Sequence, residues 1–184
     1  MDKNYFIIHG SFGSPFSNWF SWLYKELTDK GEKAIAPQFP IGVGYQNFEN
    51  WSKLLNYYKD LGLINENTVF VGHSISPVFI SKFLITNKIK VSKLVFVSGF
   101  NNVFDIAEDY DTVNETMYLE NIEKIHGYCD DITCIYSNND PYVKHEYLED
   151  FANKVADKKE LIKDAGHLNS EFGYDKFDEI LKYL

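Results

Sequence analysis

The sequence predicts an α/β fold in which about six parallel strands are covered by helices on both faces of the sheet. Two observations support this prediction. Short apolar segments alternate with longer stretches whose apolar residues recur at helical spacing. Several of the short segments are continuous runs of β-branched or aromatic residues, which is typical of strands buried on both faces. The 184 residues fit one domain, 1–184, that is large enough to bury a core.

Taken in chain order, the apolar segments give the strands and the apolar stripes give the helices between them. Trp19, Leu23 and Leu27 recur every four residues before Gly31, which is a good C-terminal stop for a helix. All the stripes are interpreted as core packing. The predicted strands are Tyr5–Ile8, Lys33–Ala36, Val69–Val71, Leu94–Ser98, Thr133–Tyr136 and Glu160–Ile162, and the further helical stripes are Phe48-Trp51-Leu55-Tyr58, Val78-Ile80-Phe83-Leu84, Tyr147-Phe151-Val155 and Phe177-Ile180-Leu181-Leu184.

Residues 99–127 interrupt this alternation. They hold no convincing strand, and we expect a short helical insertion, a small lid, after the fourth strand. Its carboxylates outnumber its single lysine, Lys124, and are expected to face solvent, as most carboxylates do. The aromatic residues that could form an apolar wall over a site are Phe100, Phe104, Tyr110 and Tyr118.

The composition argues against several classes of protein. The formal net charge is −9 and arginine is absent, so nucleic-acid binding is not expected. No signal peptide is recognisable and no apolar run approaches the ~18 residues of a membrane span, so the cytoplasm is the expected compartment. Cys129 and Cys134 are too few for a disulfide framework and match no common zinc spacing. With no H-E-x-x-H pattern either, neither a metal nor another cofactor is expected.

A candidate nucleophile, Ser74, follows the third predicted strand and precedes a predicted helix. Residues 72–76, Gly-His-Ser-Ile-Ser, match the strained strand-to-helix turn G-x-S-x-G except that Ser76 replaces the second glycine. Serine is among the smallest substitutes for glycine, and Pro77 is tolerated in the first turn of a helix. The alternative is that Ser74 is only the N-cap of that helix.

Further polar residues follow other predicted strands. Asp140 comes after the fifth strand and His167 after the sixth, which completes the order Ser, Asp, His of an α/β-hydrolase triad. Ligands of open parallel sheets bind beyond the carboxyl ends of the strands, where these side chains would meet. Asp164 is the competing carboxylate. Among the other histidines, His73 is expected to be packed and His126 and His145 to be solvated.

The loop after the first strand, His9-Gly10-Ser11-Phe12-Gly13, would supply the remaining part of such a site. Acyl transfer needs donors aimed at the developing oxyanion, usually two backbone N–H groups. These would come from Ile75 and from the first loop, at Ser11 or Phe12, with Ser11 preferred. His9, Phe12 and Phe100 are candidate pocket-lining residues. A phosphate cradle is the rival interpretation of this loop, but it has neither G-x-G-x-x-G nor a GK[ST] ending.

The sequence resembles the small serine hydrolases typified by retinoblastoma-binding protein nine, within the α/β-hydrolase superfamily, from Tyr5 to the C-terminus. The resemblance implies a compact hydrolase with strand order 2-1-3-4-5-6, in which Ser74 is the nucleophile, His167 the general base and Asp140 its orienting carboxylate. Ser76-Pro77 departs from the family pattern. The landmarks are the first loop, Trp19, Trp22, Lys25-Glu26-Leu27, Pro37-Gln38-Phe39-Pro40, Val69-Phe70-Val71-Gly72-His73-Ser74, Leu94-Val95-Phe96-Val97-Ser98, Asn139-Asp140-Pro141 and Gly166-His167.

We therefore expect a serine hydrolase that cleaves a small-molecule ester or amide without a cofactor, either carboxylesterase-like or an aminoacyl-amide hydrolase. The alternative is a non-catalytic protein that binds a small ligand on the same fold, because the fold alone does not decide function. The sequence names no protein partner.

Overall fold

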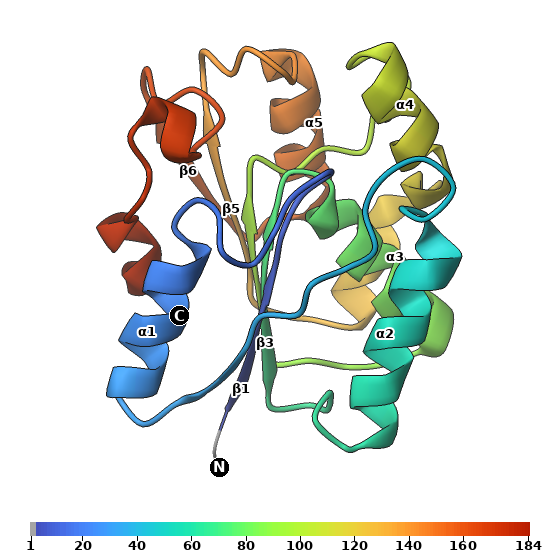
Figure 1. Cartoon of the computed structure of the whole chain (residues 1–184), viewed down its shortest axis with the longest axis vertical. Helices are drawn as coiled ribbons and strands as arrows, with labels where there is room; N and C mark the ends of the chain where they lie inside the picture. The colour runs from blue at the N-terminus through green and yellow to red at the C-terminus, as the bar shows by residue number, and fades with distance from the viewer. Residues whose placement is uncertain (1–2) are drawn as a thin grey trace.

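One parallel sheet organises the molecule (Figure 1). The computed structural model describes residues 3–184. Its sheet has six strands in the order β2-β1-β3-β4-β5-β6, and every neighbouring pair is parallel. The predicted fold class and strand order are therefore confirmed. The strands are β1 (Asn4–Ile8), β2 (Lys33–Ile35), β3 (Thr68–His73), β4 (Lys93–Val97), β5 (Ile132–Ser137) and β6 (Lys158–Ile162).

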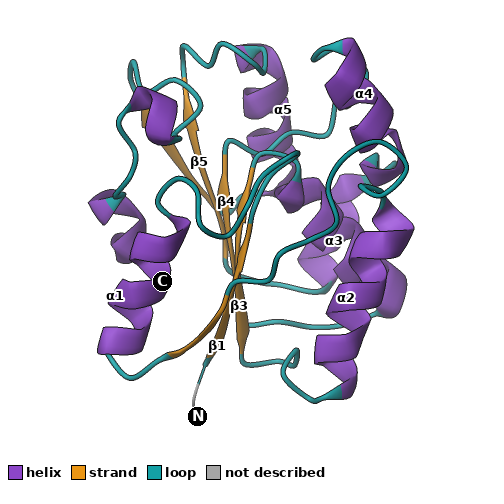
Figure 2. Ribbon diagram, viewed as in Figure 1, coloured by secondary structure: helices purple, strands orange, loops and turns teal. Residues whose placement is uncertain are grey.

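Helices cover both faces of the sheet, as Figure 2 shows: α1 lies on one face with the C-terminus of the chain, and α2, α3 and α5 lie on the other. Each of these four helices forms where an apolar stripe predicts one. The helices are α1 (Phe20–Asp29), α2 (Phe48–Asp60), α3 (Ser76–Asn87), α4 (Glu108–Asn114) and α5 (His145–Val155), with short 3₁₀ helices η1 (Glu115–Met117), η2 (Ile122–Gly127), η3 (Ser170–Phe172) and η4 (Asp178–Tyr183).

The alternation of side chains along the strands divides the apolar interior into two cores. In β1, Phe6 and Ile8 point to the core shared with α2, α3 and α5. Tyr5 and Ile7 point to the opposite core, where α1 and the C-terminal segment pack. Successive strand residues face opposite sides of a sheet, so strands covered on both faces are apolar at every position. This burial explains the continuous apolar runs in the sequence.

Two of the differences from the predicted elements have a clear physical reason. Ser98 lies just outside β4, because its φ of 49° is a left-handed conformation that no strand residue adopts. The C-terminal stripe forms only the 3₁₀ helix η4. Its apolar residues are nevertheless core residues, since Phe177 and Ile180 are fully buried. A segment this short gains little from helix propagation, so packing sets its conformation.

The insertion between β4 and β5 is helical, as predicted, and consists of α4, η1 and η2. It is fastened to the body by polar contacts. The Lys82 ammonium of α3 donates to the carbonyl oxygens of Thr116 and Tyr118, at 2.7 and 2.9 Å. The backbone N–H of Phe48 donates to the Thr116 hydroxyl at 2.8 Å. Within residues 3–184, no helix has both the length and the apolar character needed to cross a membrane.

Candidate functional site

Ser74 occupies a strained turn between β3 and α3. Its φ of 64° is rare for a residue other than glycine. Its backbone N–H donates to the Val97 carbonyl at 2.9 Å, which extends the β3–β4 ladder into the turn. The helix begins at Ser76 with Ile75 as N-cap, and no side chain caps it. Ser74 is therefore not the N-cap of α3 but lies in a strained strand-to-helix turn.

Ser76 fills the place of the missing glycine, and its hydroxyl makes contacts that glycine cannot. The side chain is fully buried. Its Oγ accepts the His73 backbone N–H at 2.7 Å and lies 2.9 Å from the carbonyl oxygens of Ile8 and His73. The Ser76 hydroxyl has one proton, so the carbonyl oxygens of Ile8 and His73 share it as acceptors. The hydroxyl thus links the carboxyl ends of β1 and β3.

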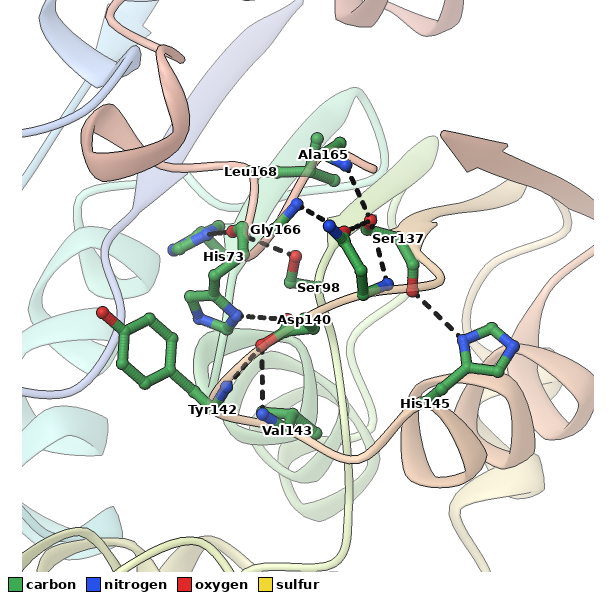
Figure 3. A network of polar contacts seen from close by, with 12 residues as sticks. His73, Ser98, Ser137, Asp140, Tyr142, Val143, His145, Ala165, Gly166 and Leu168 are labelled. Carbon is green, nitrogen blue, oxygen red and sulfur yellow. Dashed lines mark hydrogen bonds and ion pairs between the residues drawn. The ribbon is translucent and has the colours of Figure 1, made fainter. Parts of the chain in front are cut away.

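His167 and Asp140 form a buried pair beside this turn. The His167 Nδ1 lies 2.5 Å from the Asp140 Oδ2, and the exposed fractions of the two side chains are 8% and 0%. The other carboxylate oxygen of Asp140 accepts the backbone N–H groups of Tyr142 and Val143, at 2.9 and 3.0 Å (Figure 3). These bonds fix the carboxylate plane toward the imidazole. Asp164 is exposed, so the structure pairs His167 with Asp140.

The loop that carries His167 is anchored on the segment before Asp140. Asp164 and Leu168 have φ values of 56° and 53°, so the loop is left-handed at two positions that lack glycine. The Ala165 N–H donates to the Ser137 Oγ at 3.0 Å, and the Gly166 N–H donates to the Asn139 Oδ1 at 2.8 Å (Figure 3). A strained backbone conformation persists only when surrounding contacts hold it in place. Here the side chains of Ser137 and Asn139 hold the loop through these hydrogen bonds.

His73 anchors the other side of the same loop. Its Nε2 lies 2.9 Å from the His167 carbonyl oxygen and must donate to it, since a carbonyl only accepts. The Ser98 hydroxyl donates to that oxygen at 3.2 Å. Burial, and next the nearby His167, lower the pKa of His73 to about 3, so it is neutral near pH 7. His73 is packed, as the sequence predicts.

The loop after β1 closes over the nucleophile. A Cβ at Gly10 would lie 2.7 Å from the Cβ of Ser74, so only glycine lets the two backbones approach this closely. Among residues 3–184, the backbone N–H groups of Ser11 and Ile75 have no hydrogen-bond acceptor. The N–H of Phe12 is already occupied, because it donates to the Gln46 Oε1 at 3.0 Å. Ser11, the predicted residue, thus has an unoccupied backbone donor in this loop.

His9 and Phe12 do not line the pocket, contrary to expectation. His9 is fully buried, its Nδ1–H donates to the Gly10 carbonyl at 2.8 Å, and its Nε2 accepts the Phe39 N–H at 3.0 Å. Burial lowers the pKa of His9, which favours the neutral imidazole that makes these two hydrogen bonds. The Phe12 ring packs edge-to-face on the ring of Tyr110, with centroids 5.2 Å apart.

A pocket of about 140 Å³ opens over Ser74 and His167. Phe100 lines it, as expected, and so does Tyr110. Phe104 and Tyr118 do not, because their rings pack on each other at 5.8 Å and both are exposed. No Asp, Glu or Lys is among the lining residues. These are Gly10, Ser11, Gly13, Asn18, Phe20, His73, Ser74, Phe100, Ile106, Tyr110, Tyr142, Val143, His167 and Asn169.

Comparison with known proteins agrees with this geometry. The family model described as serine hydrolase matches residues 5–184. The chain belongs to the serine hydrolase family. The ydeN gene product of Bacillus subtilis is similar in structure, with a TM-score of 0.82, 25% sequence identity and 98% of each chain covered. The predicted family and superfamily are therefore confirmed, and hydrolase activity is supported.

Two more distant structures share the fold of this serine hydrolase. A YdeN-like hydrolase from Pectobacterium atrosepticum has a TM-score of 0.67 at 14% identity, covering 99% of this chain and 90% of the other. Est1E from Butyrivibrio proteoclasticus, solved with ferulic acid bound, has a TM-score of 0.69 at 13% identity, covering 98% and 89%.

Several site residues of this serine hydrolase escape sequence analysis. Asn18, Tyr142 and Asn169 line the pocket but belong to no apolar stripe and no motif. Tyr142 is two residues after Asp140 and places its ring 5.3 Å from the His167 ring. Closeness in sequence to the predicted triad residues is the one signal that points to Tyr142 and Asn169. Within residues 3–184, no cluster of side chains could hold a metal ion.

Proposed function

We propose that this serine hydrolase cleaves small, neutral esters or amides through Ser74, His167 and Asp140, by way of an acyl-enzyme. The observation that carries the proposal is the 2.5 Å contact between His167 and Asp140 in the pocket that also contains the strained Ser74. In this arrangement the carboxylate fixes the imidazole tautomer. The other ring nitrogen, Nε2, is then the acceptor for a serine proton.

In the proposed reaction, the Ser74 Oγ attacks the substrate carbonyl carbon while its proton passes to the His167 Nε2. The resulting imidazolium is stabilised by Asp140. Collapse of the tetrahedral intermediate expels the alcohol or amine, which takes the proton from His167. Water then attacks the acyl-enzyme with His167 again as base, which releases the acid and restores Ser74.

The oxyanion of the intermediate would be held by the backbone N–H groups of Ile75 and Ser11. Neither N–H has a hydrogen-bond acceptor within residues 3–184. The contact between Gly10 and Ser74 brings the first loop against the elbow, as a two-donor oxyanion hole requires. Such donors stabilise charge that develops only in the transition state, so they raise kcat.

The substrate class follows from the pocket lining. Aromatic and aliphatic side chains with a few amides suit a neutral group of modest size, and the absence of charged lining residues other than histidine disfavours ionic substrates. Carboxylesters are the favoured class, because their alcohol leaves more readily than an amine. The proposed ligand is therefore a small ester or amide. A cytoplasmic location stays a prediction.

A fluorophosphonate probe tests the proposal, because it reacts readily only with an activated serine. We expect one labelled residue, Ser74, together with hydrolysis of p-nitrophenyl acetate or butyrate. Ser74→Ala should abolish both while the protein stays folded by circular dichroism. Ser170→Ala, at an exposed serine, is the matched control and should label normally. Binding of a small ligand without labelling or turnover would favour the non-catalytic alternative.

A further inference from the structure

A buried chain of hydrogen bonds connects the first loop to the lid. The Phe12 backbone N–H donates to the Gln46 Oε1 at 3.0 Å, and the Gln46 Nε2 donates to the Asn114 Oδ1 at 3.0 Å. The Ser11 hydroxyl also donates to the Asn114 Oδ1, at 2.6 Å. The exposed fractions of Gln46 and Asn114 are 2% and 0%. These hydrogen bonds therefore join three separate segments through two buried amide side chains.

The backbone N–H of Phe12 sets the donor and acceptor of every hydrogen bond in this series. An N–H can only donate, so the Gln46 oxygen must face Phe12 and its amide nitrogen must face Asn114. Asn114 must then present its oxygen. As a result its own amide nitrogen, Nδ2, is buried without a partner. An unsatisfied buried donor is unfavourable, so this arrangement lowers the stability of the folded protein.

The loop needs such an anchor because it is strained. Phe12 has a φ of 54°, in the left-handed region that a residue with a side chain rarely adopts. The Gly13 N–H donates to the Gly10 carbonyl at 3.2 Å, which closes the turn but leaves Ser11 and Phe12 without backbone bonds of their own. The side chains of Gln46 and Asn114 hold these two residues instead.

We infer that Gln46 and Asn114 are positioning residues that aim the Ser11 N–H at the oxyanion. The inference rests on the proposed function and deepens it. Neither side chain lines the pocket, so each acts through the loop. Asn114 is the last residue of α4, the lid helix that also contributes Tyr110 to the pocket. The lid and the oxyanion loop are thereby one connected unit.

Two substitutions remove these hydrogen bonds while keeping the number of side-chain heavy atoms: Gln46→Met and Asn114→Leu. Each should lower kcat for a p-nitrophenyl ester about 100-fold, the scale of losing one oxyanion donor, while KM changes less than about threefold. Asn114→Asp keeps an acceptor for Ser11 and Gln46 and should recover most of the rate. Thr116→Val, which removes the lid-to-body bond with Phe48, is the matched control and should leave kcat unchanged.

Amide hydrogen exchange at Phe12, measured by NMR, gives a readout independent of turnover. Exchange there should be at least tenfold faster in Gln46→Met than in the wild type or Thr116→Val. An active wild type whose kcat and Phe12 exchange are both unchanged by Gln46→Met and Asn114→Leu would overturn the inference. An equal loss of kcat in Thr116→Val would do the same. A wild type without label or turnover would instead refute the proposed function.

Discussion

At the scale of single residues, the choice between two carboxylates near His167 decides the triad. Asp140→Asn removes the charge that orients and stabilises the imidazole, and it should lower kcat by about 10⁴ while the protein stays folded. Asp164→Asn should change kcat little, because that side chain is exposed and its backbone N–H makes the contact with Asn138. Steady-state rates of the two variants on one ester make the comparison, and the reverse ranking would displace Asp140.

Ser76 is predicted to matter for stability more than for chemistry. Ser76→Ala removes the hydroxyl shared by Ile8 and His73 and should lower the free energy of unfolding by about 1–3 kcal/mol. Ser76 does not line the pocket, so kcat/KM should fall less than about tenfold. Ser81→Ala, which removes a bond within α3, is the control for denaturant titrations. A loss of kcat/KM near 10² with full stability would assign Ser76 a part in the reaction.

At this scale, sequence analysis can propose site residues that directly follow predicted strands, but it misses contacts between residues far apart in the chain. Ser74, Asp140 and His167 each follow a strand that the apolar pattern predicts. Gln46 and Asn114 lie 68 positions apart and meet only through tertiary structure. Polar loop residues have no period, so no pattern predicts which of them will meet.

At the scale of elements, the insertion at residues 99–127 is proposed to limit which substrates reach the site. Its carboxylates are predicted to face solvent, and none of them lines the pocket. Asp105 is paired with Lys144 and Tyr147, and the Asp111 side chain accepts the Ile106 N–H at 3.0 Å. These two carboxylates therefore make structural contacts, Asp105 with the start of α5 and Asp111 within the insertion. The pocket is left to the aromatic residues.

Matched neutral and cationic esters should consequently be turned over unequally, with the neutral member preferred. The ratio of kcat/KM between them should stay the same when salt is raised past ~0.1 M, where screening lengths fall to about 10 Å. The comparison uses p-nitrophenyl esters of equal length, one with a terminal ammonium. A cationic preference that fades with salt would show that lid carboxylates act on the substrate.

Elements with a long apolar stripe or run are the ones that sequence predicts well. Each of the six strands differs from its predicted span by one or two residues at one or both ends, because strand ends are defined by backbone hydrogen bonds that the apolar pattern does not report. The C-terminal stripe has the spacing of a helix but forms η4, since its burial by α1 outweighs helix propensity. The lid was predicted as helical, yet which of its aromatic residues face the pocket depends on packing that periodicity does not describe.

At the scale of the whole molecule, the two cores hold histidines that must stay neutral. Burial lowers the pKa of His73 to about 3 and also lowers that of His9. In the unfolded chain both histidines would titrate near their ordinary value of about 6.5. Between these values the unfolded state binds protons that the folded state does not. Folding stability therefore rises with pH in this range and is lost as the pH falls from about 6.5 toward 3.

This linkage predicts acid-induced unfolding that depends on His73. For one buried histidine the free energy of unfolding should fall by about 1.4 kcal/mol per pH unit below pH 6.5. His73→Gln removes the titrating group but keeps an amide donor for the His167 carbonyl, so its stability should depend less steeply on pH over the same range. His126→Gln, at an exposed position, is the control. Urea titrations between pH 4 and 8 give the slopes, and parallel slopes for wild type and His73→Gln would contradict the prediction.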